Sequence, residues 1–176
     1  MHRLFIGIEP PPAIKTQLLD LMGGVSGARW QTAAQLHLTL RFVGEVDRHQ
    51  ANDIAEALSD LRHPAFELSL AGVGTFEYKG QVHTLWAGVT PFESVHVLHK
   101  KVDQAVVRTG LLPETRAFQP HITLARLSGR VGTLSHFLDA NEGLASEPFV
   151  VDTVCLYESA LTSEGSVYTV VERYGL

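Results

Sequence analysis

The chain has little of several residue types, and each shortage excludes a class of protein. Cys155 is the single cysteine among 176 residues, so no internal disulfide and no cysteine-rich metal site can form. No stretch approaches the roughly 20 consecutive apolar residues of a membrane-spanning helix. The apolar start, residues 4–8, is too short for a secretory signal and predicts a first strand instead. We therefore expect a cytoplasmic protein with no membrane segment.

Positive charge is also scarce. Lysine and arginine number 14 against 19 acidic residues, which leaves a formal net charge of -5. Proteins that coat duplex nucleic acid need a strongly basic face, so the composition favours local contacts with one or two phosphates instead. Because no linker, low-complexity segment or heptad pattern interrupts the chain, we expect one domain over residues 1–176, a monomer without an obligate protein partner.

Strands and helices alternate along the whole chain. Apolar residues at period two or in short runs predict strands near residues 4–8, 36–43, 66–70, 85–89, 120–127, 149–156 and 167–171. Helical spacing predicts helices near residues 14–25, 51–61, 95–105 and 131–138. Strands that come in pairs between the helices favour antiparallel sheets. The predicted fold class is therefore α+β.

One short pattern occurs twice, about half the chain apart. Its copies are Leu36-His37-Leu38-Thr39-Leu40 and Pro120-His121-Ile122-Thr123-Leu124. Period two places each histidine and threonine on one face of a strand and the aliphatic residues on the other. A single copy is typical of any half-wet strand. Two copies in matching contexts favour a pseudo-symmetric pair of lobes whose polar faces meet across a central cleft.

Two facing imidazoles suit acid/base chemistry at neutral pH. Histidine titrates near pH ~6.5, so one ring can accept a proton while the other donates one. Threonine hydroxyls beside them can donate to phosphate oxygens whose charge changes in the transition state. The strained ring of a 2′,3′-cyclic phosphate is an apt substrate because it opens without a metal.

The motifs and their flanks resemble the 2H phosphoesterase superfamily, and within it the bacterial and archaeal RNA 2′,3′-cyclic phosphodiesterases, also known as 2′-5′ RNA ligases. The similarity covers essentially the whole chain. The matching segments are residues 3–8, 36–46, 118–126 and 156–159. The resemblance implies a bilobal fold, with two pseudo-symmetric antiparallel sheets and helices packed on their outer faces.

The resemblance also implies a reaction and a set of roles. RNA ends bearing a 2′,3′-cyclic phosphate would be hydrolysed to 2′-phosphomonoesters, with no metal or other cofactor. His37 would donate a proton to O3′, and His121 would accept one from water. Thr39, Thr123 and Arg126 would bind the phosphate. Strand parity places Arg126 on the opposite face from His121, unless a bulge intervenes.

Several alternatives stay open. The chain could act on another cyclic nucleotide or a 2′-5′ linkage, or bind RNA ends or nucleotides without catalysis. Arg41 shares strand parity with His37 and is a candidate only. His96 and His99 could bind a metal, although a solvated helix face is favoured. An aromatic side chain is expected to stack on the terminal base, and the candidates are Phe5, Trp30, Phe42, Phe76, Tyr78 and Trp86.

Overall fold

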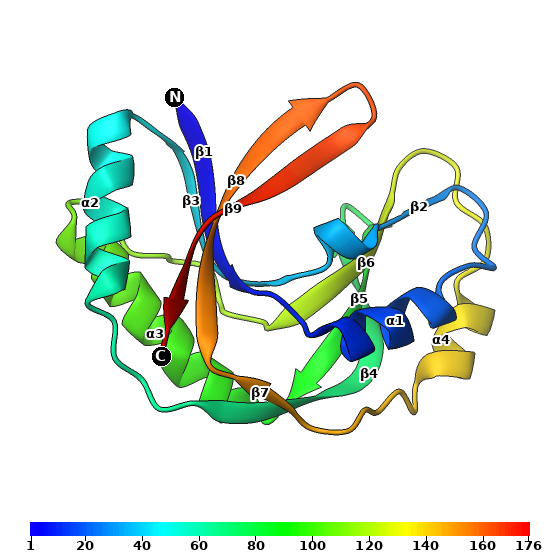
Figure 1. Cartoon of the computed structure of the whole chain (residues 1–176). Helices are drawn as coiled ribbons and strands as arrows, with labels where there is room; N and C mark the ends of the chain where they lie inside the picture. Colours follow the sequence, from blue (N-terminus) through cyan, green and yellow to red (C-terminus); the bar gives the residue numbers. More distant parts are fainter.

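The computed structural model describes all 176 residues and follows the predicted alternation of elements (Figure 1). The strands are β1 (His2–Ile8), β2 (Ala28–Trp30), β3 (Leu38–Val46), β4 (Phe66–Tyr78), β5 (Gln81–Thr90), β6 (His121–Leu127), β7 (Phe149–Val151), β8 (Thr153–Thr162) and β9 (Gly165–Gly175). The helices are α1 (Pro12–Leu21), α2 (Arg48–Ser59), α3 (Phe92–Arg108) and α4 (Ser135–Asn141), with a short 3-10 turn, η1, at Ala33–Gln35. No helix is long and apolar enough to cross a membrane.

The strands pair antiparallel in the order β7-β4-β5-β6-β3-β1-β8-β9, and β2 adds to β6. The two halves of this sheet meet only where β3 pairs with β6, at Leu38 and Ile122. These two residues lie between the histidine and the threonine of each motif. The predicted α+β fold with antiparallel strands is therefore confirmed. The structure refines it, because the two expected sheets are joined through this narrow seam into one path.

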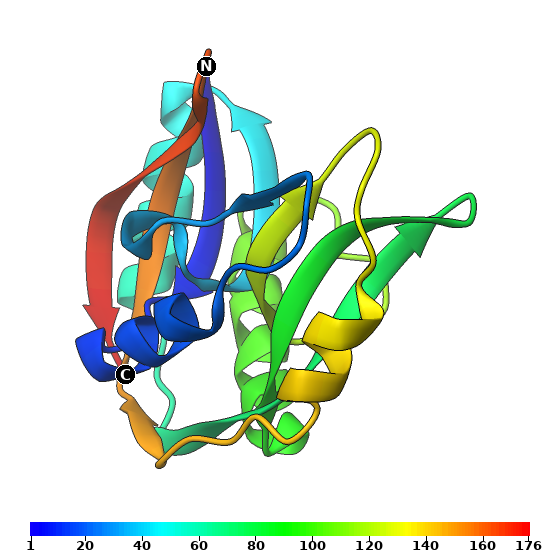
Figure 2. The same ribbon diagram turned by 90° about the vertical axis from the view of Figure 1, so that its right-hand side faces the viewer.

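The helices cover the outer sides of the strands (Figure 2). Helices α2 and α3 pack on each other and on β1 and β3, whereas α4 contacts β4. The aliphatic residues of both motifs are buried in one main core, and they are Leu36, Leu38, Leu40, Ile122 and Leu124. Full burial of such a side chain contributes roughly 1.5–3 kcal/mol. The apolar half of each motif thus anchors its strand and leaves the polar half free for the cleft.

Each motif strand contains a bulge at the same motif position. In β3, Gly7 pairs with Thr39 and Ile6 with Arg41, so Leu40 has no partner on β1. In β6, Trp86 pairs with Thr123 and Leu85 with Ala125, so Leu124 has no partner on β5. An extra residue in one strand reverses the alternation of faces beyond it. Arg41 and Phe42 in β3, and Arg126 in β6, therefore point opposite to what unbroken period two predicts, and a second shift at Val43 follows in β3.

The bulges decide which later residues reach the cleft. Beyond Leu124, Arg126 returns to the face of His121, which resolves the parity conflict noted in the sequence. Beyond Leu40, Phe42 takes the corresponding position in the other lobe, and its side chain is 39% exposed. Arg126 and Phe42 are therefore counterparts under the pseudo-symmetry. Phe42 lines the cavity between the lobes, and the charge of Arg126 acts on both histidines.

Candidate active site

His37 is held in one tautomer by the chain that precedes it. Its Nδ1 lies 2.7 Å from the carbonyl oxygen of Gln35, and its Nε2 lies 3.0 Å from the Thr39 hydroxyl oxygen. Because a carbonyl oxygen only accepts, Nδ1 carries the proton and donates. In the neutral ring, Nε2 is then the acceptor and Thr39 donates to it. Nε2 is the nitrogen available for proton transfer.

His121 repeats this arrangement in the other lobe. Its Nδ1 donates to the carbonyl oxygen of Gln119 at 2.7 Å, which again leaves Nε2 as the reactive nitrogen. In both motifs the accepting carbonyl belongs to the residue two positions before the histidine. Local backbone geometry therefore prepares both rings as bases when neutral and as acids when protonated.

Burial is the main cause that lowers the pKa of both histidines. Burial and the nearby charges of His121 and Arg126, opposed in part by the bond to Gln35, lower the pKa of His37 to about 4. The ring is packed beside Phe5, Tyr157 and Tyr168, with centroid distances of 4.7, 5.7 and 5.1 Å. The pKa of His121 is lowered by burial and then by the charge of Arg126. Both imidazoles are thus neutral at pH 7 in the free protein.

This shift predicts a pH-dependent loss of stability. The pKa of His37 is about 4 when folded and 6.5 when unfolded, so the unfolded chain binds protons more tightly. Stability should fall as the pH drops from 6.5 to 4, by about 3 kcal/mol from this residue. Urea unfolding at pH 7 and at pH 4 should show a smaller loss for His37→Gln than for the wild type. An equal loss of stability in the two proteins would contradict the lowered pKa of His37. The variant His49→Gln, at an exposed position, serves as the control.

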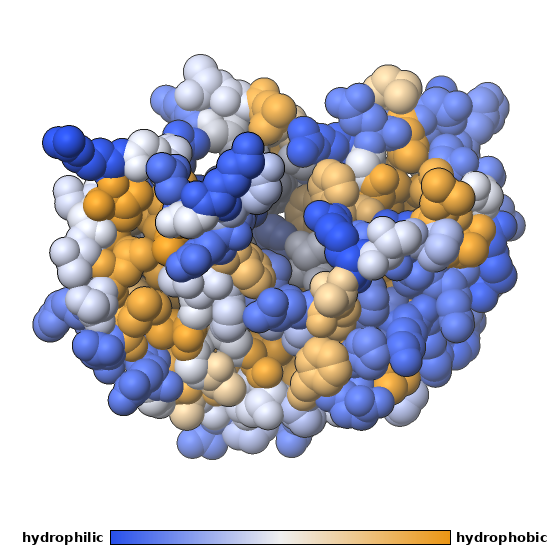
Figure 3. Space-filling model, turned by 180° about the vertical axis from the view of Figure 1, so that it is seen from behind, coloured by the Kyte–Doolittle hydropathy of each residue, from blue (hydrophilic) through white to orange (hydrophobic).

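A cavity of about 410 Å³ opens where the two lobes meet, and the space-filling view shows a hollow rimmed by both hydrophilic and hydrophobic side chains (Figure 3). Residues of both lobes line the cavity, among them Thr39, Phe42, Phe76, His83 and His121. The site therefore combines the polar faces of β3 and β6, as the repeated motif predicts. Thr123 is buried on the same strand face as His121.

Arg126 lies within electrostatic reach of both histidines. Its charge lowers the pKa of His37 and of His121, and its Nη1 donates to the Thr84 hydroxyl oxygen at 3.2 Å. Thr84 is fully buried in β5, so this bond ties an otherwise exposed guanidinium to a rigid strand. Arg126 is thereby fixed as a positive charge close to both rings.

Arg41 has a different environment from Arg126. It is buried, and its Nε lies 2.6 Å from a carboxylate oxygen of Asp103 on α3. Its Nη1 donates to the carbonyl oxygen of Phe42 at 2.8 Å and lies 3.8 Å from a carboxylate oxygen of Glu114. The parity that made Arg41 a candidate ends at the Leu40 bulge. This guanidinium is occupied by carboxylates and holds β3 to α3.

His99 corrects the expectation of a solvated helix face. It is buried, its Nδ1 donates to the carbonyl oxygen of Leu40 at 2.6 Å, and its ring stacks on Phe118 with centroids 4.0 Å apart. Leu40 is the bulged residue, whose carbonyl lacks a regular strand partner. His99 therefore supports the bulge from α3. No group of three or more histidine, cysteine or acidic side chains in the structure could hold a metal ion.

Fold and site define a class of protein with two pseudo-symmetric His-x-Thr motifs across one cleft. The chain belongs to the LigT-like phosphoesterase family, whose model matches residues 8–86 and 89–168. The RNA 2′,3′-cyclic phosphodiesterase of Thermotoga maritima is 30% identical, over 96% of this chain and 92% of the relative.

Solved structures agree with this family membership. The crystal structure of Escherichia coli LigT in apo form aligns with a TM-score of 0.80 at 26% identity, covering 99% of this chain and 97% of that one. The same protein complexed with 3′-AMP aligns with a TM-score of 0.77 at 25% identity, covering 99% and 98%. The resemblance inferred from the motifs is therefore confirmed across nearly the whole chain.

Proposed function

We propose that the protein hydrolyses 2′,3′-cyclic phosphodiester ends of RNA to 2′-phosphomonoesters, without a metal ion. The observation that carries this proposal is the matched pair of imidazoles, His37 and His121. In both rings Nδ1 donates to a backbone carbonyl oxygen. Each ring belongs to a different lobe, and the charge of His121 acts on His37. The name of the Thermotoga relative supports the substrate class.

In the proposed reaction, His121 is the base and His37 the acid. Nε2 of neutral His121 accepts a proton from water while the water oxygen forms a bond to phosphorus. The bond from phosphorus to O3′ breaks, and protonated His37 delivers its Nε2 proton to that oxygen. Because His37 is neutral in the free protein, it must gain this proton as the anionic phosphate binds and raises its pKa.

Thr39 links the protonation state of His37 to phosphate binding. Its hydroxyl donates to Nε2 of the neutral ring. Once that nitrogen is protonated it can only donate, so the hydroxyl proton becomes free to point at a phosphate oxygen. Thr123 holds the equivalent position beside His121. Arg126 supplies the positive charge for the phosphate oxygens.

Phe42 is the aromatic side chain that we assign to the terminal base. Its ring is half-exposed, lines the catalytic cavity, and has the Arg3 guanidinium 5.6 Å from its centroid. Phe5 is buried beside His37 and offers no free face of that kind. Stacking on an exposed ring holds a base without sequence preference.

The remaining expectations concern the setting of the reaction. We propose that residues 1–176 act as one bilobal domain, because the cleft needs a motif from each lobe. We further propose a cytoplasmic monomer whose partners are RNA ends, in keeping with a single free cysteine that is buried.

Product analysis on a short oligonucleotide ending in 2′,3′-cyclic phosphate tests the proposal. We expect a 2′-phosphate product and unchanged turnover after treatment with EDTA. A 3′-phosphate product, or loss of activity that Mg²⁺ or Zn²⁺ restores, contradicts the mechanism. Binding of the oligonucleotide without turnover would indicate a binding module. Turnover confined to 2′-5′ linkages or other cyclic nucleotides would indicate a sister activity.

A further inference from the structure

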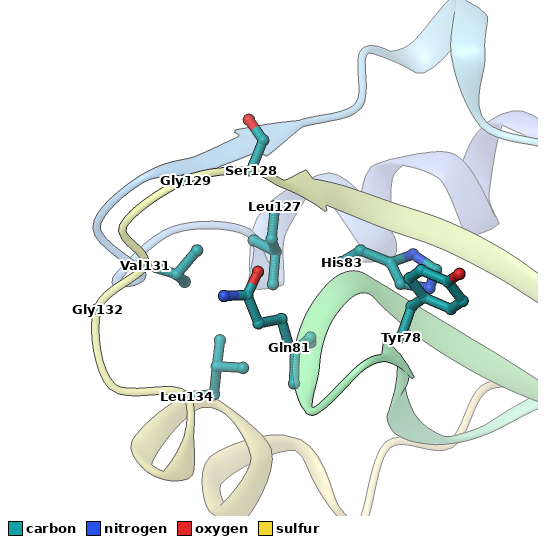
Figure 4. Close-up of a pocket in the computed structure, with 10 residues that line it drawn as sticks. Tyr78, Gln81, His83, Leu127, Ser128, Gly129, Val131, Gly132 and Leu134 are labelled. Atoms are coloured by element: carbon teal, nitrogen blue, oxygen red, sulfur yellow. The ribbon is translucent and has the colours of Figure 1, made fainter.

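A second cavity, of about 560 Å³, lies beyond the catalytic one (Figure 4). It opens between the end of the β4–β5 hairpin and the segment that follows β6. Tyr78, Gln81 and His83 come from the hairpin, and Leu127, Ser128 and Val131 come from the opposite wall. Figure 4 shows Tyr78, Gln81 and His83 on the hairpin, with the Gln81 side chain directed toward Val131. None of these residues has a role in the reaction described above.

The second cavity and the catalytic cavity share one lining residue, His83. His83 is also linked to the phosphate-binding arginine. Its Nδ1 lies 2.8 Å from the Thr84 hydroxyl oxygen, which accepts from Arg126 Nη1 at 3.2 Å. The Thr84 hydroxyl thus joins Arg126 to His83, the residue at the wall between the two cavities.

The walls of this cavity suit one nucleotide. Tyr78 is 68% exposed and presents a ring on which a base can stack, and the Lys79 ammonium lies 5.4 Å from the centroid of that ring. Lys79 supplies a positive charge for a backbone phosphate, and the side-chain amide of Gln81 can both donate and accept. Leu127 and Val131 provide an apolar floor. Aromatic, cationic and apolar groups meet here as single-stranded RNA requires.

We propose that this cavity binds the nucleotide immediately upstream of the one that carries the cyclic phosphate. A cyclic phosphate occupies O2′ and O3′ of the last residue, so an RNA chain can continue only from O5′. The preferred substrate is therefore an RNA chain of two or more nucleotides, and cyclic mononucleotides are poorer substrates. This inference rests on the proposed function and adds to it the length of substrate that the protein recognises.

The test compares a cyclic mononucleotide with a dinucleotide that has the same cyclic end. For the wild type, kcat/KM should be at least about tenfold higher for the dinucleotide, because stacking of one more base contributes binding. Tyr78→Ala should remove most of this advantage, and Tyr78→Phe, which keeps the ring, should retain it. Phe42→Ala is the matched comparison, since it should lower both rates and leave their ratio unchanged.

Equal rates for the two substrates in the wild type, or an unchanged ratio in Tyr78→Ala, would overturn the inference. Absence of turnover with both substrates would instead count against the proposed function. In that event, binding of a 2-aminopurine dinucleotide ending in a 2′-phosphate still decides the matter. The fluorescence of its upstream 2-aminopurine should be quenched on binding to the wild type and not on binding to Tyr78→Ala. Equal quenching by the two proteins would refute the subsite. Because Tyr78 is largely exposed, folding of these variants is not at risk.

Discussion

Replacement of His121 by alanine is expected to lower kcat/KM on a cyclic-phosphate RNA end by about 10³-fold, within the range of general acid–base catalysis. The expected loss of activity follows from the tautomer of His121. Nε2 of this ring is the acceptor in the free protein, because Nδ1 donates to the carbonyl of Gln119. His37→Ala should cause a loss of similar size, since no other side chain would deliver the proton to O3′. Single-turnover kinetics with a dinucleotide would measure both effects.

The two histidines should act as a unit, so their losses should not multiply. The double variant His37→Ala/His121→Ala is expected to be little slower than either single variant. His49→Ala, an exposed change on α2, should keep wild-type rates. Full activity in either single variant would exclude the two-histidine mechanism. Circular dichroism of each variant would show that a loss does not come from unfolding.

The repeated motif could be found in the sequence because its two faces differ so clearly. Leu38 and Ile122 alternate with polar residues, and the same alternation that buries them directs His37 and His121 away from the core. Only the pairing of β3 with β6 had to be added by the structure. The fold class therefore follows from the pairing of strands between the helices, and the two histidines follow from a period-two motif that occurs twice.

The bulges could not be predicted from the sequence, and the assignments of Arg41, Phe42 and Arg126 depend on them. A bulge is set by which strand lies alongside and by what satisfies its unpaired groups. At Leu40 the backbone carbonyl oxygen accepts a hydrogen bond from His99, which lies 59 residues away in the sequence. Without the bulge, Arg41 shares the catalytic face and Phe42 does not. With it, Phe42 shares that face, and the Arg41 guanidinium turns to Asp103 and Glu114.

The sequence signal for Arg126 was also incomplete for the same reason. Its parity pointed away from His121, and only the resemblance placed it near the phosphate. The Leu124 bulge brings it back, and the bond to Thr84 fixes it there. Because Thr84 is a strand residue with no sequence pattern of its own, this anchor could be recognised only in three dimensions.

Arg126→Ala is expected to reduce kcat/KM by about 10²-fold, because it removes a positioned, charged donor from the phosphate oxygens. Arg126→Lys should recover only part of the loss, since an ammonium keeps the charge but not the forked geometry. Thr84→Val should lower kcat/KM less than Arg126→Ala or Arg126→Lys does, because it leaves the guanidinium present but unanchored. The exposed α3 residue Arg108 provides the control Arg108→Ala.

The same variant has a second, independent readout. The charge of Arg126 lowers the pKa of both His37 and His121. Its removal should therefore raise both histidine pKa values, and titration of the imidazole signals by NMR would detect this without substrate. A slower enzyme with unshifted histidines would mean that Arg126 acts through the fold. Raised pKa values together with a lower rate would show that Arg126 acts in two ways. Its charge disfavours protonation of His37 in the free protein, and the same charge stabilises the bound phosphate.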